Sequence, residues 1–240
     1  MSGMRTGDID IPTLDGAIPG YRAMPDAGDP FPVVLVVQEI FGVNEHIRDV
    51  CRRFAKLGYM AIAPELFVRQ GDVSKIQDHK EIISKVVSKV PDEQVMSDLD
   101  AAVTWAAGTG SADTSRLGIV GFCWGGRAVW LYAAHSDKLK AGGAFYGQLL
   151  GQYPRKALDA APGLKAPVLG FYGAKDKSIP IEHVHQMQAA LLQAGKDSNI
   201  MVYPDAGHAF FADYRSSYRE PDAKDAWGHL LEWFKAHGVV

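Results

Sequence analysis

The chain has little of several features that would define other protein classes. Its 240 residues include only two cysteines, Cys51 and Cys123, too few for a disulfide framework. Neither sign of charge dominates, since 25 lysines and arginines stand against 28 aspartates and glutamates. That balance gives no electrostatic footprint for nucleic acid or an anionic membrane. No stretch approaches the roughly 20 apolar residues of a membrane span, and the first ten residues hold no apolar signal-peptide core.

What is present is typical of an ordinary globular protein. Hydrophobic residues make up 47% of the chain and charged residues 22%, which excludes disordered and collagen-like chains. A chain of this length buries roughly 70–75% of its unfolded surface and needs no disulfide or metal staple. We therefore expect a reduced, cytoplasmic protein that forms one domain over residues 1–240. It is expected to act as a monomer or small homo-oligomer, without nucleic-acid or membrane partners.

Short apolar runs alternate with helical patterns through most of the sequence. Several runs are continuously apolar, as is typical of strands covered on both faces. Between them, apolar residues recur at helical spacing and form one stripe per helix. This alternation predicts an α/β fold with a mostly parallel central sheet and helices on both faces. The predicted strands are 33–37, 60–63, 117–120, 142–145, 168–172 and 199–203, and the predicted helices include 95–106, 184–191 and 227–234.

Two segments depart from this alternation. The first 30 residues hold four prolines and are predicted to form one or two short antiparallel edge strands, such as 8–11 and 17–22. Residues 69–90 are longer than an ordinary connection and are predicted to be a helical excursion over one end of the sheet. The sequence leaves open whether this excursion is a solvated surface helix or covers a site.

The densest chemical signal is a glycine-flanked cysteine, Cys123, between an apolar strand and a helix expected to begin near Gly126. The pattern Gly-x-Cys-x-Gly is that of a nucleophile elbow with cysteine in place of serine. The glycines are needed because the sharp turn leaves no room for a Cβ atom two residues before or after the nucleophile. A helix N-terminus also favours the thiolate form. The alternative is a buried cysteine beside a tight turn.

Partners for such a nucleophile follow later strands in the expected order of acid and then histidine. Asp176 comes after the run 168–172, and His208 comes after the run 199–203. Both are therefore predicted at the carboxyl edge of the sheet, near Cys123. Asp205 is a competing acid, but it shares a loop with His208 and would have to fold back on it.

A third element follows the first core strand, where an acyl-transfer site of this architecture draws part of its oxyanion hole from backbone N–H groups. Ile40 and Trp124 are the candidate donors. Glu39 is unusual at its position. It either takes part in catalysis or is an acidic residue that favours the dipole of the following helix.

Together these segments resemble the dienelactone hydrolase family (carboxymethylenebutenolidases) of the α/β-hydrolases, from about Gly7 to Phe234. The resemblance implies a triad in which Cys123 is the nucleophile, His208 the base and Asp176 the group that orients the imidazole. It also implies that Glu39 contacts the resting thiol and helps to deprotonate it when substrate arrives. The implied reaction is hydrolysis of a lactone or small ester through a thioester, without metal or organic cofactor. Tyr146 resembles a pocket tyrosine of the family. The segments that carry the resemblance are Gln38-Glu39-Ile40-Phe41-Gly42, Gly121-Phe122-Cys123-Trp124-Gly125-Gly126, Asp176 and Gly207-His208-Ala209-Phe210.

The substrate is less well defined than the chemistry. Dienelactone hydrolases hold the substrate carboxylate with arginines, one of them four residues after the histidine, where this chain has Ala212. Only Arg69 and Arg215 are candidates to replace it. We therefore predict a pocket for neutral or weakly polar esters and lactones, with Phe41, Tyr146, Phe210 and Arg215 as substrate-binding candidates.

Other classes of function fit the sequence less well. Gly121 and Gly126 have the glycine spacing of a P-loop, but Arg127 and Ala128 replace its lysine and its serine or threonine. No His-Glu-x-x-His pattern indicates a metal site. A non-catalytic hydrolase-like binding protein and a hydrolase of a different ester or thioester class remain as alternatives.

Overall fold

The structure is a computed structural model that describes residues 3–28, 30–151 and 155–240. In it, the apolar runs of the sequence form the central strands. Two compact units make up the chain, Met1–Gly118 and Ile119–Val240. Strand β5 (Ala112–Phe122) runs from the first unit into the second. The single domain expected from the sequence stays a prediction.

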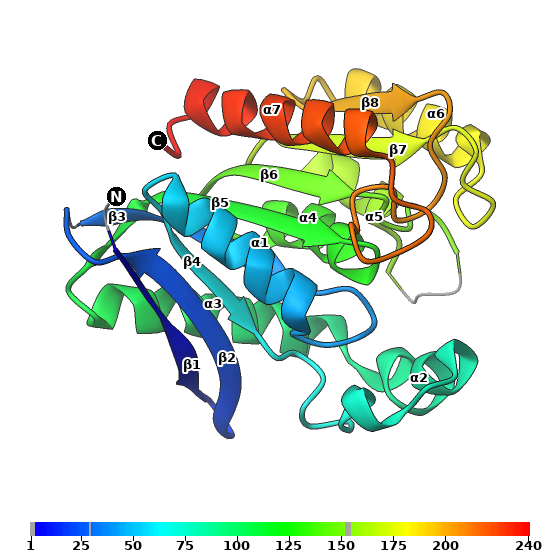
Figure 1. Ribbon diagram of the computed structural model, residues 1–240. Coiled ribbons are helices and arrows are strands. Elements are labelled where there is room, and N and C mark those ends of the chain that lie inside the picture. The colour runs from blue at the N-terminus through cyan, green and yellow to red at the C-terminus, as the bar shows by residue number, and fades with distance from the viewer. Residues whose placement is uncertain (1–2, 29, 152–154) are drawn as a thin grey trace. The chain divides into compact units, whose positions relative to one another are not determined.

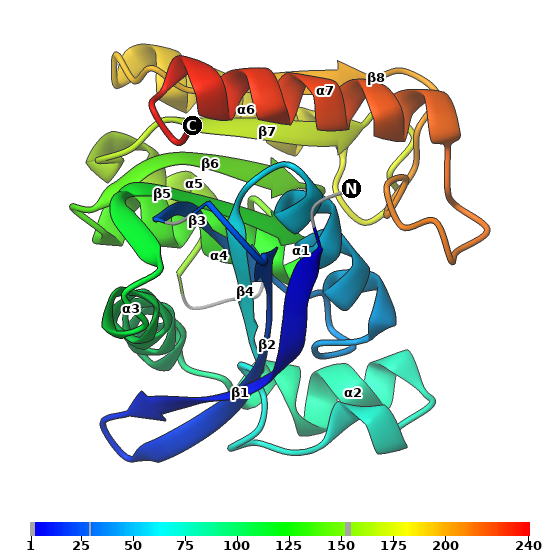
Figure 2. The ribbon, with the colours of Figure 1, turned by 60° about the vertical axis from the view of Figure 1, so that its left-hand side comes forward.

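The first unit is a four-stranded arrangement in the order β1-β2-β4-β3. Strands β3 (Phe31–Val37) and β4 (Met60–Pro64) are parallel and buried along their whole length, as their continuous apolar runs predicted. Helix α1 (Glu45–Lys56) and helix α3 (Asp92–Gly108) cover opposite faces of these strands (Figures 1 and 2).

The edge hairpin is longer than the sequence predicted. Strands β1 (Met4–Thr13) and β2 (Gly16–Pro25) pair antiparallel along ten residues each, where only 8–11 and 17–22 were expected. Pro12 lies within β1 and Pro19 within β2, and neither ends its strand, whereas Pro25 is the last residue of β2. Pro12 is on β1, the edge strand of this order, where the ladder can spare a backbone donor.

The excursion predicted at 69–90 is helical in short pieces. It contains the 3₁₀ turns Val73–Lys75 and Val87–Lys89 and one helix, α2 (His79–Lys85). Ile82 of α2 is buried, so the excursion packs through its own apolar residues. At the start of α2, the His79 ring lies edge-on to the Phe41 ring with 5.0 Å between centroids. The excursion therefore contacts the segment that follows β3.

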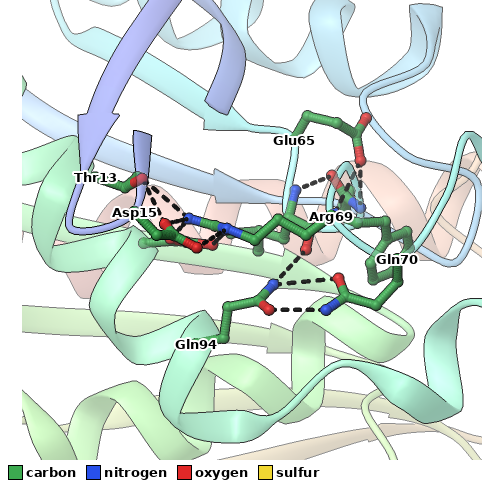
Figure 3. Close-up of polar contacts among 10 residues, drawn as sticks. Thr13, Asp15, Glu65, Arg69, Gln70 and Gln94 are labelled. Carbon is green, nitrogen blue, oxygen red and sulfur yellow. Dashed lines mark hydrogen bonds and ion pairs between the residues drawn. The ribbon is translucent and has the colours of Figure 1, made fainter. Parts of the chain in front are cut away.

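Arg69, at the entry to the excursion, is held by acids of the same unit (Figure 3). Its guanidinium donates to Asp98 at 2.7 Å and to Asp15 at 2.7 and 2.8 Å. It also donates to the Thr13 hydroxyl at 3.0 Å. These contacts tie the β1–β2 turn to α3. They give Arg69 a structural role and account for its donors without a substrate carboxylate.

The second unit contains the end of β5 and the strands β6, β7 and β8, in the order β5-β6-β7-β8. Strand β6 (Leu139–Phe145) runs parallel to β7 (Val168–Gly173), which runs parallel to β8 (Asn199–Tyr203). The helices of this unit are α4 (Trp124–His135), α5 (Ala157–Ala160), α6 (Ile181–Gln193) and α7 (Glu220–Ala236), with a 3₁₀ turn at Ala161–Gly163.

Two adjacent glycines in β6 let helices approach both faces of the sheet. A Cβ atom at Gly142 would press on Val129 of α4, and one at Gly143 would overlap Leu230 of α7. Successive strand residues point to opposite faces, so α4 and α7 cover the two sides of β6 (Figure 1). No helix in the described ranges is long and apolar enough to cross a membrane.

Candidate active site

The turn between β5 and α4 has the strained geometry of a nucleophile elbow. Cys123 has φ 52° and ψ −114°, a conformation that non-glycine residues rarely adopt. A Cβ atom at Gly121 would overlap the carbonyl group of Gly125, which confirms the steric reason for this glycine. Helix α4 begins at Trp124 and not near Gly126, because Cys123 itself occupies the N-cap position.

The elbow is anchored to the neighbouring strand. The Cys123 N–H donates to the Phe145 carbonyl at the end of β6, at 3.0 Å. A Cβ atom at Gly126 would overlap that same carbonyl group, and one at Gly147 would overlap the backbone of Gly126. The strained residue is therefore held by backbone contacts from two sides. An unfavourable backbone conformation persists only where surrounding contacts of this kind fix it.

Three side chains of the second unit form a continuous hydrogen-bonded line. His208 Nε2 lies 3.2 Å from Cys123 Sγ, and His208 Nδ1 lies 2.7 Å from Asp176 Oδ2. The Asp176 side chain is 1% exposed and that of His208 28%, so the acid is shielded while the imidazole is reachable. The three residues predicted from strand order are thus brought together.

Asp205, the competing acid, points elsewhere. Its carboxylate accepts a hydrogen bond from Lys175 Nζ at 2.6 Å, and both side chains are more than 60% exposed. The geometry therefore favours Asp176 over Asp205 as the partner of the imidazole.

Ser178 belongs to this cluster, and the sequence reasoning missed it. Its hydroxyl donates to Asp176 Oδ1 at 2.6 Å and lies 3.2 Å from His208 Nδ1. The backbone N–H groups of Ser178 and Ile179 also donate to Asp176 Oδ1, at 2.8 and 3.2 Å. Three donors on Oδ1 leave Oδ2 to face the imidazole. The spacing Asp-x-Ser was the available signal, because an aspartate side chain often accepts from the backbone N–H two residues later.

Charge in the cluster is set by competition between burial and hydrogen bonding. Burial lowers the pKa of His208, but the hydrogen bonds to Asp176 and Cys123 outweigh it and raise the pKa to about 10. Burial raises the pKa of Asp176, but hydrogen bonds from His208 and Ser178 outweigh it and hold the pKa below its ordinary value. The imidazole is therefore protonated and Asp176 ionised over the neutral range.

Aromatic side chains support the histidine from one side. The Tyr146 ring lies edge-on to the His208 ring at 5.2 Å and contacts Phe210 at 5.6 Å between centroids. Tyr146 and Ala209 are the other two non-glycine residues with positive φ in the described chain, at 38° and 59°. Backbone strain thus gathers around His208. Tyr146 and Phe210 are fully buried, and their predicted contact with substrate stays a prediction.

The remaining candidates lie in three other places. Glu39, Ile40 and Phe41 follow β3 in the first unit, where Glu39 is 1% exposed and the other two are half-buried. Trp124 is the first residue of α4, where helix amide groups point out of the N-terminus. Arg215 is half-buried in the segment before α7. Their roles stay predictions.

Metal ligands do not gather in the part of the chain that the structure describes. No group of three or more histidine, cysteine, aspartate and glutamate side chains there has the arrangement to hold a metal ion. The polar groups of the site are instead paired with one another in a line that ends at a sulfur atom. That arrangement is typical of acyl-transfer enzymes that use an activated side-chain nucleophile.

The elbow, the strand order and the acid–imidazole–thiol line define an enzyme of the α/β-hydrolase class. The family model of the "Dienelactone hydrolase family" matches residues 18–238, and the chain belongs to this family. A protein of Methylorubrum extorquens named "Putative carboxymethylenebutenolidase" is 60% identical, over 100% of this chain and 84% of that protein.

Two further relatives extend the comparison. The crystal structure of a "Putative Dienelactone Hydrolase" from Klebsiella pneumoniae superposes with a TM-score of 0.95 at 52% identity, covering 97% of this chain and 99% of the other. It confirms the predicted α/β-hydrolase fold with a mostly parallel sheet and helices on both faces. A Bradyrhizobium protein named "Probable 2-oxo-3-(5-oxofuran-2-ylidene)propanoate lactonase" is 31% identical over 95% of this chain and 93% of its own. The chain is thus a hydrolase of this family.

Proposed function

We propose that the protein hydrolyses lactones or small carboxylic esters through a thioester on Cys123. The observation that carries the proposal is the line from Cys123 Sγ through the His208 ring to Asp176 Oδ2, with distances of 3.2 and 2.7 Å. A non-catalytic binding protein has no need for a strained cysteine aligned with a buried acid–imidazole pair.

The reaction proceeds in two acyl transfers. The Cys123 thiolate attacks the carbonyl carbon, and the carbonyl oxygen becomes an oxyanion held by backbone N–H groups. The C–O bond then breaks, and the departing alkoxide takes the proton from His208 Nε2, which leaves a thioester. Water attacks the thioester while His208 takes up its proton. Collapse of the second oxyanion expels the thiolate and releases the acid.

Three residue assignments of the proposal come from the family pattern. The backbone N–H groups of Ile40 and Trp124 are assigned as oxyanion donors, and Glu39 is assigned to contact the resting thiol and to help take its proton when substrate arrives, which forms the attacking thiolate. The Trp124 N–H lies at the start of α4, directly after the nucleophile, and this position supports its assignment. No metal or organic cofactor has a step in this mechanism.

The proposed substrate class is a neutral or weakly polar lactone or small ester. Lactonase and carboxymethylenebutenolidase names among the relatives support the lactone. The engagement of Arg69 by Asp15 and Asp98 supports a pocket less committed to a carboxylate, because this arginine has other partners. Arg215 is the remaining candidate for a carboxylate.

The proposal is tested by trapping the intermediate. The enzyme is mixed with excess activated ester, quenched in acid, digested and weighed by mass spectrometry. One acyl group on the peptide that contains Cys123 is the expected result, with turnover of a lactone and its linear ester by the same sample. Turnover without any acylated cysteine would contradict the covalent route. Comparing kcat/KM for a carboxylate-bearing lactone and its methyl ester tests the substrate class.

A further inference from the structure

One carboxylate, which follows the neighbouring strand β4, accepts hydrogen bonds from near both ends of the segment 38–44 that follows β3. Glu65 directly follows β4, and its Oε1 accepts a hydrogen bond from Gln38 Nε2 at 3.1 Å. Its Oε2 accepts one from the Val43 N–H at 2.8 Å. The four residues 39–42 lie between these two contacts. They include Glu39, Ile40 and Phe41, so one side chain fixes both ends of the stretch that carries three candidate site residues.

Hydrogen bonds between the two segments run in both directions. Gln38 is fully buried, and its Oε1 accepts a hydrogen bond from the Leu66 N–H at 3.4 Å, on the segment that carries Glu65. Glu65 Oε1 also accepts from the Phe67 N–H at 3.3 Å. Gln38 thus donates to Glu65 and accepts from Leu66 across the two segments, whereas the Phe67 N–H donates to Glu65 from within the same segment. A carboxylate, which only accepts, fits here, whereas an amide would place a donor against a donor.

Backbone geometry at Gly42 makes room for the carboxylate. Gly42 has φ +70°, and a Cβ atom there would approach Glu65 Oε2 to 2.7 Å. The segment then ends at Asn44, whose side chain caps α1 by accepting from the Ile47 N–H. The position of 39–42 is thus determined by the carboxylate on one side and by the helix cap on the other.

We propose that Glu65 is a positioning residue that sets the oxyanion donor of the segment 39–42. The inference rests on the proposed function, because it takes Ile40 as that donor. An oxyanion donor must sit within about 0.5 Å of its productive place, and removing one such donor costs about 10²–10³-fold in kcat. Glu65 acts on the reaction only through the backbone it holds.

The test is a swap of the two side chains. Glu65→Gln puts an amide NH2 group against a backbone N–H that now donates to the carboxylate, and Gln38→Glu puts two carboxylates face to face. Each single variant is therefore expected to lose about 10–100-fold in kcat, with KM changed by less than about threefold. The double variant Gln38→Glu/Glu65→Gln again pairs an amide with a carboxylate. It is expected to recover about tenfold or more of the lost kcat.

Two readouts separate positioning from general damage. Alkylation of Cys123 by iodoacetamide forms no oxyanion, so its rate is expected to stay within about threefold in Glu65→Gln. The matched control is Gln70→Glu, because Gln70 ties the same segment to α3 through a paired amide, Gln94, at 2.8 Å (Figure 3). This control also exchanges an amide for a carboxylate, but at a residue bonded to α3, and it is expected to keep kcat within about threefold.

Three outcomes overturn the inference. One is a Glu65→Gln variant with unchanged kcat. A second is a double variant that folds but has no higher kcat than the single variants. If Glu65→Gln alone does not fold, the double variant is compared with Gln38→Glu. The third is alkylation slowed as much as turnover. Failure of the proposed function shows differently, as hydrolysis that survives Cys123→Ala.

Discussion

Cys51 lies in the middle of α1, fully buried, whereas Cys123 lies at the turn that opens α4, half-buried and in contact with an imidazole. Burial raises the pKa of Cys51, so this thiol stays neutral. Cys123 has strained backbone, a helix N-terminus and a protonated histidine beside it. The same side chain is thus a packing group in one region and a candidate nucleophile in the other. Reactivity is a property of the surroundings.

The largest expected effect separates the two cysteines directly. Cys123→Ala is expected to lower turnover of a lactone or chromogenic ester by about 10⁴–10⁶-fold, because a triad loses its function with its nucleophile. Cys51→Ala is expected to keep kcat within about threefold and to lower thermal stability, because it leaves a small cavity in the core. Circular dichroism melts show that both variants fold. An active Cys123→Ala enzyme would reverse the comparison.

The next largest effect is expected when Asp176, the acid that pairs with His208, is replaced. Asp176→Asn is expected to lower kcat by about 10²–10⁴-fold, since the imidazole loses both orientation and charge support. In the wild type the pKa of His208 is about 10, so the imidazolium is present at neutral pH and is lost as pH rises through that value. Activity is expected to fall there. In Asp176→Asn the pKa of His208 falls, and the alkaline limb is expected to move down by about 1–3 pH units.

A pH profile of kcat/KM from pH 5 to 11 measures that shift. Thermal melts of the variant at the same pH values separate loss of chemistry from unfolding. An alkaline limb that stays in place in Asp176→Asn would mean that another group controls the imidazole.

A smaller effect is expected at Ser178, which touches both members of the acid–imidazole pair. Ser178→Ala removes one of three donors from Asp176 Oδ1 and leaves the two backbone donors. One hydrogen bond is worth about 1 kcal/mol, so kcat is expected to fall about fivefold. Because Ser178 helps to hold the pKa of Asp176 down, the acid limb of activity is expected to move to higher pH.

The matched control is Ser198→Ala. The Ser198 hydroxyl accepts from the Val168 N–H at 3.0 Å, at the end of the strands away from His208. It is expected to leave kcat and the acid limb unchanged, and Ser178→Thr is expected to restore the wild-type values. Equal effects of Ser178→Ala and Ser198→Ala would reduce Ser178 to a packing role.

What the sequence predicted well has a local cause. Cys123 stands between glycines that the elbow requires, and Asp176 and His208 each directly follow a buried apolar run. Topology then brings parallel strand ends to one edge, so order along the chain was sufficient to predict their meeting. The extent of β1 and β2 was underestimated, because the pairing of Met4 with Pro25 comes from the partner strand and not from propensity.

What the sequence could not predict has partners far away in the chain. Arg69 meets Asp15 and Asp98, which are 54 and 29 residues distant, and no pattern around Arg69 specifies them. Glu65 meets Gln38 across 27 residues. Ser178 lies only two residues from Asp176, but its approach to His208 depends on how two loops fold. Side-chain hydrogen bonds between loops are fixed by tertiary packing, which periodicity does not encode.

The smallest expected effect is at Asp205, which makes it the sharpest check on the choice of acid. By sequence alone Asp205 competes with Asp176, since it is only three residues from His208. In the structure it forms an exposed ion pair with Lys175, and such pairs contribute little because solvent screens the two charges. Asp205→Asn is therefore expected to change kcat less than about twofold and to leave the alkaline limb near pH 10. The measurement is the same pH profile as for Asp176→Asn, with the two variants side by side. If Asp205→Asn moved the alkaline limb and Asp176→Asn did not, the imidazole would take its charge support from its own loop, and the line that ends at Cys123 would have a different acid.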